Sequence, residues 1–242
     1  MAFDIHFPQE LRGTQLDAYL AQGWYRIGQA VFTTDTIDAH QRGEPGEEVR
    51  EFRVFWLRYR LTDFQFGKKQ LKLLAANRKF KADIGECVLD PGLEALYASY
   101  KSSIDFTIAP SLYQSLYKLE FYEAPDLQVY DSRLISVSYE GKLIAAGVFD
   151  RGARSLAGIV NFFDPGFRKY SPGKYLMLLK IQYALQQGME YYYPGYISCD
   201  FKKFDYKLWP GESFAEILNP LTQKWEPYSP ALMDLLKKEV VW

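Results

Sequence analysis

The 242-residue sequence contains only two cysteines, Cys87 and Cys199, and only two histidines. Two cysteines cannot form the disulfide framework of a small secreted protein, so we expect free thiols in a reducing compartment. No stretch approaches the roughly 20 apolar residues that a transmembrane helix needs. The first residues also lack the basic segment and apolar run of a secretory signal. The composition therefore predicts a cytoplasmic protein without a membrane span.

The chain also lacks an excess of charge of either sign, because its formal net charge is -1 and its pI is about 6.2. A protein that binds nucleic acid through its overall charge is excluded, and any contact with RNA must come from a local basic patch. Aromatic residues are abundant, with 19 tyrosines and 17 phenylalanines. These rings serve either core packing, which is the commoner use, or stacking against nucleobases.

The first part of the sequence predicts a series of short elements. We expect helices over 16–22, 68–80, 91–101 and 111–118, strands over 26–34 and 49–61, and a loop over 36–48. We place a boundary near residue 95, between an N-terminal region over 1–95 that carries a basic helix and a larger domain over 96–242.

The second part alternates strands with an apolar helix. Strands are predicted over 134–139, 143–149, 156–163, 191–197 and 214–218, with a helix after Ser171 that ends at Gly188. Ser171 suits the N-cap and Pro172 the first helical position. The predicted order, β-β-β-α-β-α-β, indicates an α/β (α+β) fold with a mixed sheet flanked by helices.

A basic segment follows residue 67. Six cations fall within fourteen residues that contain no Asp or Glu: Lys68, Lys69, Lys72, Arg78, Lys79 and Lys81. At 100° per residue, the side chains at positions 68, 72 and 79 project within about 40° of one another, beside apolar Leu71 and Leu74. Such a stripe fits a helix that lies along RNA phosphates, although most charged helix faces are simply solvated.

Four stretches, in this order, resemble the arginyl-tRNA–protein and leucyl-tRNA–protein transferases. They are YEGKLIAAGVFD over 139–150, FFDP over 162–165, SPGKY over 171–175, and YYPGYISC over 192–199 followed by Tyr206-Lys207. A weaker similarity covers GWYRIG over 23–28 and the basic segment. The resemblance implies a sheet like that of N-acetyltransferases (a GNAT-like fold) in the C-terminal half. It also implies an aminoacyl-tRNA donor and the N-terminus of an acceptor protein as partners.

The sequence departs from the family pattern at three places. The family's N-terminal cysteine cluster is replaced by VFTTDT over 31–36, so we expect no metal and no other cofactor. Pro194 stands where the family has an apolar residue before Gly195. The spacing from Cys199 to Tyr206 is about two residues longer. These changes leave the acceptor preference open.

The resemblance also suggests site residues. Asp150 and Asp164 follow strands and would position the amine as catalytic groups together with Tyr196. The residues expected to bind the donor are Ser171, Gly173, Tyr175, Gly195, Tyr206 and Lys207, and those expected to bind tRNA are Lys68, Lys69, Lys72, Arg78 and Lys79. Plain structural roles compete with each assignment.

Each of these residues also suits an ordinary structural role. Asp164 precedes Pro-Gly and suits a turn, while Ser171 suits a simple helix cap as well as an anion site. Tyr196 fits a strand core, Gly195 a bulge, and Cys199 packing.

Transfer of an aminoacyl group from an ester requires little from the protein. The ester is already activated, and an α-amine with a pKa near 7.7–8.0 is partly neutral at cellular pH. Positioning of the two reactants, removal of one proton and stabilisation of the oxyanion are sufficient. A CoA-dependent acyltransferase is the rival enzyme, although the phosphate-binding loop of such enzymes is incomplete over 168–175. A non-catalytic tRNA-binding relative is the second alternative.

Overall fold

The computed structural model describes residues 3–40, 49–119, 122–123 and 128–239. The helices are α1 (Gly13–Ala21), α2 (Lys68–Asn77), α3 (Pro91–Ser102), α4 (Leu112–Tyr117), α5 (Pro172–Gln186) and α6 (Pro230–Glu239), with 3-10 helices η1 (Pro165–Tyr170), η2 (Lys202–Leu208) and η3 (Glu212–Phe214). The strands of the N-terminal part are β1 (Asp4–His6), β2 (Tyr25–Ile27), β3 (Ala30–Thr33), β4 (Thr36–His40), β5 (Val49–Arg53), β6 (Phe55–Arg60) and β7 (Lys81–Glu86). Those that follow are β8 (Lys118–Leu119), β9 (Tyr122–Glu123), β10 (Ser132–Tyr139), β11 (Lys142–Arg151), β12 (Ser155–Phe163), β13 (Tyr191–Ile197), β14 (Ala215–Asn219) and β15 (Lys224–Pro227).

An eight-stranded mixed sheet forms the centre of the molecule, in the order β15-β14-β6-β13-β12-β11-β10-β7. Among these described strands only the pair β12–β13 is parallel, because α5 connects the two as a crossover helix. The expected α/β class, a mixed sheet flanked by helices, is confirmed. Two of the eight strands, β6 and β7, come from the part of the chain before residue 96.

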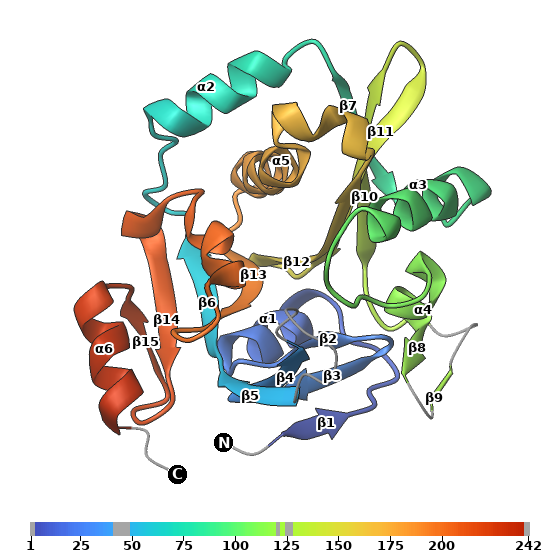
Figure 1. Ribbon diagram of the computed structural model, residues 1–242. Helices are drawn as coiled ribbons and strands as arrows, with labels where there is room; N and C mark the ends of the chain where they lie inside the picture. The colour runs from blue at the N-terminus through green and yellow to red at the C-terminus, as the bar shows by residue number, and fades with distance from the viewer. Residues whose placement is uncertain (1–2, 41–48, 120–121, 124–127, 240–242) are drawn as a thin grey trace.

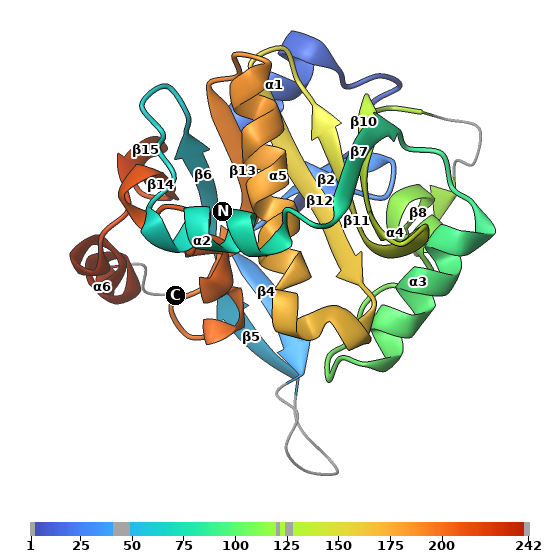
Figure 2. The ribbon, with the colours of Figure 1, turned by 90° about the horizontal axis from the view of Figure 1, so that it is seen from above.

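Three hydrophobic clusters hold the layers together. On one face, α5 packs its buried side chains, among them Leu176 and Ile181, against Phe149 and Tyr192 of the sheet. On the other face, α3 and α4 cover β10 to β12, while the N-terminal elements cover the neighbourhood of β13 and β14. Figures 1 and 2 show the same division, with α2 and α5 on one side of the sheet and the N-terminal elements on the other. Because both faces are covered, the central strands are largely buried.

Several sequence expectations are corrected by the structure. Residues 36–40, expected in a loop, form β4 and pair with β5, and the rest of that predicted loop (41–48) lies outside the described residues. The edge strand β7 was not expected, because its six residues are all exposed and carry no burial pattern. The segment between β13 and β14 forms 3-10 turns instead of a helix, and β15 and α6 follow the strand that was expected to be last.

The basic helix α2 exists but buries a different face from the expected one. Leu71 is 53% exposed, whereas Gln70 and Asn77 are buried. The Gln70 amide donates a hydrogen bond to the Trp209 carbonyl (2.6 Å), and the Asn77 amide donates to the Tyr170 carbonyl (3.1 Å). Polar side chains therefore anchor α2, which periodicity of apolar residues could not reveal.

Across the described residues, no helix is both long and apolar enough to cross a membrane.

Candidate active site

The parallel strands β12 and β13 separate part-way along their length. They pair only at Ser155–Ala157 with Tyr191–Tyr193. Beyond these residues β12 pairs only with β11, and β13 pairs with β6. The Tyr25 hydroxyl lies where the strands part, 3.0 Å from the Tyr193 carbonyl and hydrogen-bonded to the Gly158 carbonyl. A side chain from the N-terminal part of the chain therefore occupies the point where the two strands separate.

A cavity of about 270 Å³, here called the central cavity, fills the split. Its walls come from β2, β3, β12, α5, β13 and η2, and they include Tyr25, Arg26, Phe32, Gly158, Asn161, Met177, Tyr192, Gly195, Tyr196, Tyr206 and Lys207. Among the described residues, the lining contains no Asp, Glu, His, Cys or Ser. The ionisable side chains of this lining are tyrosines, Arg26 and Lys207. Arginine stays protonated and tyrosine is not basic at cellular pH, so among them only Lys207 can serve as a neutral base.

Lys207 has the environment of a proton acceptor. Its ammonium donates a hydrogen bond to the Tyr196 carbonyl (2.8 Å) and lies 4.8 Å and 4.7 Å from the ring centres of Tyr196 and Phe204. Burial lowers the pKa of Lys207 from 10.5 to about 7. A substantial fraction of this side chain is then a neutral amine near neutrality, which suits general base catalysis.

Gly195 permits the close approach of this lysine. Its φ of +97° is a conformation that glycine adopts easily and other residues rarely adopt. A Cβ at this position would lie 3.2 Å from the Lys207 nitrogen. The glycine therefore serves the geometry of the site through both its backbone angle and its missing side chain.

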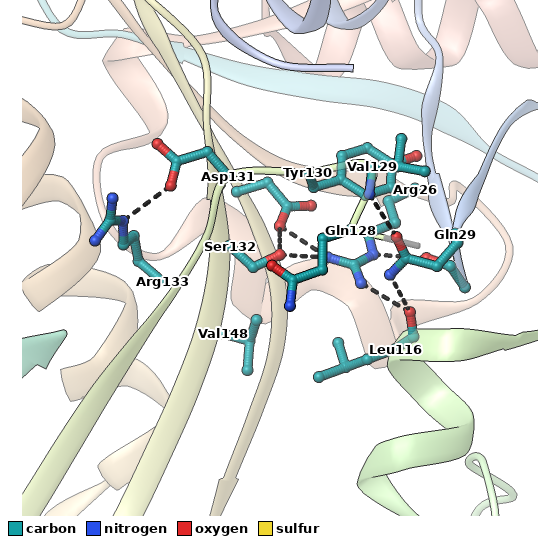
Figure 3. Close-up of polar contacts among 12 residues, drawn as sticks. Arg26, Gln29, Leu116, Gln128, Val129, Tyr130, Asp131, Ser132, Arg133 and Val148 are labelled. Carbon is teal, nitrogen blue, oxygen red and sulfur yellow. Dashed lines mark hydrogen bonds and ion pairs between the residues drawn. The ribbon is translucent and has the colours of Figure 1, made fainter. Parts of the chain in front are cut away.

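Arg26 closes the cavity from the side of the N-terminal elements, and its guanidinium donates four hydrogen bonds. It pairs with Asp150 (2.8 Å), and both side chains are almost inaccessible. It also donates to Ser132, to the Leu116 carbonyl and, through Nε, to the Gly28 carbonyl. Figure 3 shows Arg26 between Ser132 and the Leu116 carbonyl, with Gln29 beside it. This cluster fixes β2 against β10, β11 and the end of α4.

Asp150, expected to position an amine, lies in this cluster and does not line the central cavity. Burial raises the pKa of its carboxyl group, and Arg26 and Ser132 act in the opposite direction. One of its oxygens accepts from Ser132 and Arg26, and the other has no partner among the described residues. The geometry gives Asp150 the role of holding Arg26 in place.

Asp164, the second expected carboxylate, lies at the opposite end of β11 from Asp150, on the order of 20 Å away at the rise of a β-strand. One oxygen accepts from the Gly166 amide (2.9 Å), and the other pairs with Lys142 (2.6 Å). Lys142 and then the Gly166 amide lower the pKa of this carboxyl group. The structure thus gives Asp164 the turn role, and the two carboxylates cannot act on one amine.

The remaining predicted residues divide into two groups. Gly195, Tyr196, Tyr206 and Lys207 come together around the central cavity, with Tyr206 47% exposed at its mouth. Ser171, Gly173 and Tyr175 belong to the start of α5 and do not line it. Ser171 takes the N-cap position with φ +51°, but its hydroxyl makes no capping hydrogen bond, contrary to expectation. Tyr175 is buried in the core on α5.

The predicted tRNA-binding cations follow the start of α2. Lys68, Lys69 and Lys72 are exposed on the helix, and Arg78 is exposed at its C-cap. Lys79 lies beyond the helix and donates to the Tyr170 hydroxyl (2.8 Å), so it does not continue the stripe expected at helical spacing.

Several residues of the cavity were missed by the sequence argument, among them Tyr25, Arg26, Asn161 and Tyr192. The first two lie in the GWYRIG stretch, which carried a recognisable signal without an assigned role. Gly158 is also required, since a Cβ there would approach the Tyr192 hydroxyl to 2.8 Å.

Residues 93–211 match the family model described as arginine-tRNA-protein transferase, C terminus. This region, just under half of the chain, is therefore similar to the C-terminal part of the arginine-tRNA-protein transferases. It contains the β12–β13 split, Gly195, Tyr196 and Lys207, whereas the cavity residues Tyr25 and Arg26 lie outside it.

Similar proteins include arginyl-tRNA–protein transferase 1 of Arabidopsis thaliana, which is 27% identical over 184 residues. That match covers 69% of this chain and 29% of the plant protein. An aspartate/glutamate leucyltransferase of Leptospira interrogans (strain Fiocruz L1-130) is 26% identical over 211 residues, with 83% of this chain and 74% of the relative covered.

Among solved structures, the C-terminal domain of a putative lysylphosphatidylglycerol synthetase from Agrobacterium fabrum is 14% identical with a TM-score of 0.45. That match covers 61% of this chain and 49% of the other. Such a distant likeness does not assign a function.

Proposed function

We propose that this protein transfers an amino acid from aminoacyl-tRNA to the N-terminal α-amine of an acceptor protein, in the cytoplasm. The observation that carries this proposal is Lys207, with its pKa near 7, in a cavity whose described lining has no carboxylate, cysteine, serine or histidine. The match of residues 93–211 to the family model and the names of the two relatives support it. Aminoacyl-tRNA is the donor partner, and the transferred amino acid is of the arginine or leucine class.

The reaction uses Lys207 twice. The nitrogen of the acceptor attacks the ester carbonyl carbon, and neutral Lys207 removes a proton from that nitrogen. The carbon–oxygen bond to the terminal ribose then breaks, and the Lys207 ammonium returns the proton to the leaving oxygen. The new bond is an amide, Lys207 returns to its neutral form, and no covalent enzyme intermediate forms.

The donor is held by two surfaces. Tyr196 and Tyr206 line the cavity and offer rings and hydroxyls to the terminal adenosine. Lys68, Lys69 and Lys72 form an exposed cationic edge on α2 for the phosphates of the tRNA. The start of α5, where Gly173 follows Ser171 and Pro172, is a place for a further phosphate, because N–H groups of a first helical turn have no acceptor within the helix.

The test is a transfer assay with tRNA pools charged with labelled amino acids. One peptide has a free N-terminus, and its matched control has the same sequence with an acetylated N-terminus. We expect label only in the free peptide, and we expect Lys207→Met to slow transfer by about 100-fold or more, as loss of a general base does.

Two other results would contradict the proposed transfer activity. Tight tRNA binding without transfer to any peptide would favour the non-catalytic alternative. Acetylation of the peptide from acetyl-CoA would favour the CoA-dependent one.

A further inference from the structure

One polar side chain of the central cavity takes no part in donor binding or in proton transfer. Asn161 lies on β12, beyond the last residue that pairs with β13, and it lines the cavity together with Lys207. Its side-chain oxygen is enclosed by protein and has no hydrogen-bond partner among the described residues. A buried polar group without a partner lowers stability, so this asparagine calls for a reason other than folding.

The surroundings of Asn161 determine which end of its amide faces the cavity. A Cβ on Gly147, the opposite residue on β11, would lie 2.6 Å from the Asn161 oxygen and 3.3 Å from Cε of Lys180. The oxygen therefore occupies the space that the missing side chain of Gly147 leaves. Lys180 donates to the carbonyls of Val148 (2.7 Å) and Val160 (3.4 Å), and a donor on that side favours the oxygen over the NH2 group.

The amide nitrogen, Nδ2, is then the polar atom of Asn161 that is available to the cavity. No described residue accepts a hydrogen bond from it. The register between β11 and β12 shifts by one residue just before Asn161, because Ile159 has no opposite residue in that ladder. Such bulges occur beside active sites, where they change the direction of a side chain.

Other donors of the central cavity are already engaged. The Tyr25 hydroxyl is bonded to the Gly158 carbonyl, Arg26 donates four hydrogen bonds, and Lys207 is the proton acceptor. A tyrosine hydroxyl rotates and can donate or accept, whereas the NH2 of an amide only donates. Asn161 thus offers a donor whose direction is set before any substrate binds.

We propose that Asn161 is a catalytic residue that stabilises the oxyanion of the transfer reaction through Nδ2. The inference rests on the proposed function. When the acceptor nitrogen adds to the ester carbonyl carbon, the π electron pair of the carbonyl moves onto its oxygen, and Asn161 donates a hydrogen bond to that oxygen. The pair returns to carbon as the bond to the ribose oxygen breaks. Asn161 transfers no proton, so the proton steps of Lys207 are unchanged.

Variants at position 161 test this role in the transfer assay. Asn161→Ala removes the donor, and we expect kcat to fall about 100-fold with little change in KM, because the lost interaction forms only in the transition state. Asn161→Asp keeps the shape but replaces the NH2 group by an oxygen, and it should be at least as slow. Asn219→Ala is the control, since this amide bonds Glu226 outside the cavity, and it should transfer at the wild-type rate.

Stability separates this role from a structural one. The Asn161 amide makes no hydrogen bond within the described part of the chain, so Asn161→Ala should unfold within a few degrees of the wild type in thermal denaturation. If Asn161→Ala unfolds, Asn161→Asp, which has the same shape, is used in its place.

A binding measurement tests the site without any transfer. Two RNA hairpins end in the single-stranded 3′ end of tRNA, and in them the aminoacyl ester is replaced by a planar amide or by a tetrahedral, anionic phosphonate. Wild-type protein should bind the phosphonate about tenfold or more tightly than the amide, because the phosphonate resembles the oxyanion intermediate. Asn161→Ala should bind the two hairpins equally.

Three results would overturn the inference: transfer by Asn161→Ala at the wild-type rate, equal binding of both hairpins by the wild type, or a preference for the phosphonate that the variants at position 161 retain. A preference that depends on Asn161, in a protein that transfers to no peptide, would keep the oxyanion site and refute the proposed activity. The two failures are therefore distinguishable.

Discussion

Replacement of Lys207 by methionine should stabilise the protein in a pH-dependent way. The reduction of its pKa from 10.5 to about 7 means that the folded state holds the charged form at a cost of about 5 kcal/mol below pH 7. Methionine has a similar length and no charge, so it removes this cost. It also loses the hydrogen bond to the Tyr196 carbonyl, which offsets roughly 1–2 kcal/mol.

The sign of the pH dependence follows from proton binding. Between pH 7 and 10.5 the unfolded chain holds a proton on Lys207 that the folded protein has released, so wild-type stability rises across this window. The Lys207→Met variant lacks this contribution. Its advantage should therefore be about 3–4 kcal/mol at pH 6 and fall to about 0–1 kcal/mol at pH 9.

Urea denaturation of both proteins at pH 6, 7.5 and 9 measures the difference. Lys180 provides a matched comparison, because burial also lowers its pKa to about 7 while its ammonium donates to the Val148 carbonyl and does not line the central cavity. Lys180→Met should show a similar dependence of stability on pH without removing the proton acceptor. A constant difference between Lys207→Met and wild type from pH 6 to 9 would mean that Lys207 titrates normally, and it would remove the basis for its role as a base.

Three further changes have defined outcomes. Gly195→Ala should cost about 1–3 kcal/mol in denaturation experiments, because φ is positive there and a Cβ would crowd the neighbouring ammonium; unchanged stability would contradict this. Arg26→Met should lower the free energy of unfolding by about 3–5 kcal/mol, since it leaves the Asp150 carboxylate buried without its partner. Adding Asp150→Leu should recover part of this stability, and a larger loss in the double variant would argue against a paired role. Lys68→Glu/Lys72→Glu should weaken tRNA binding and reduce the slope of log affinity against log salt by about one for each phosphate that is no longer neutralised. Charge reversal of the two basic residues at the end of α6 should change neither quantity, and equal effects at both places would refute the α2 assignment.

The sequence predicted the central elements because their signals are local. A strand, a tight turn and a second strand over 134–149, and an apolar helix between Pro172 and Gly188, all appear at the expected places. The edge strand β7 and the anchoring of α2 by Gln70 were not predictable in this way. One is exposed along its length, and the other depends on a carbonyl 139 residues away in the chain.

The candidate site shows the same limit. Gly195, Tyr196, Tyr206 and Lys207 were found through motifs, and they surround one cavity. Asp150 lies near the end of β11 and Asp164 directly follows β12, but the residues that engage them decide their roles. Arg26 is 124 residues from Asp150 in sequence, so no local pattern shows that this carboxylate is already paired.

The position of β6 in the large sheet bears on how this protein is divided for experiments. The strand lies between β13 and β14, although it precedes the family-matched region by more than 30 residues. A fragment limited to residues 93–211 would expose the inner edge of β13 and lose the hydroxyl that wedges β12 apart from it. Recombinant fragments trimmed to the homologous segment should therefore aggregate through that exposed edge, and the intact central sheet has to be produced with the first sixty residues attached.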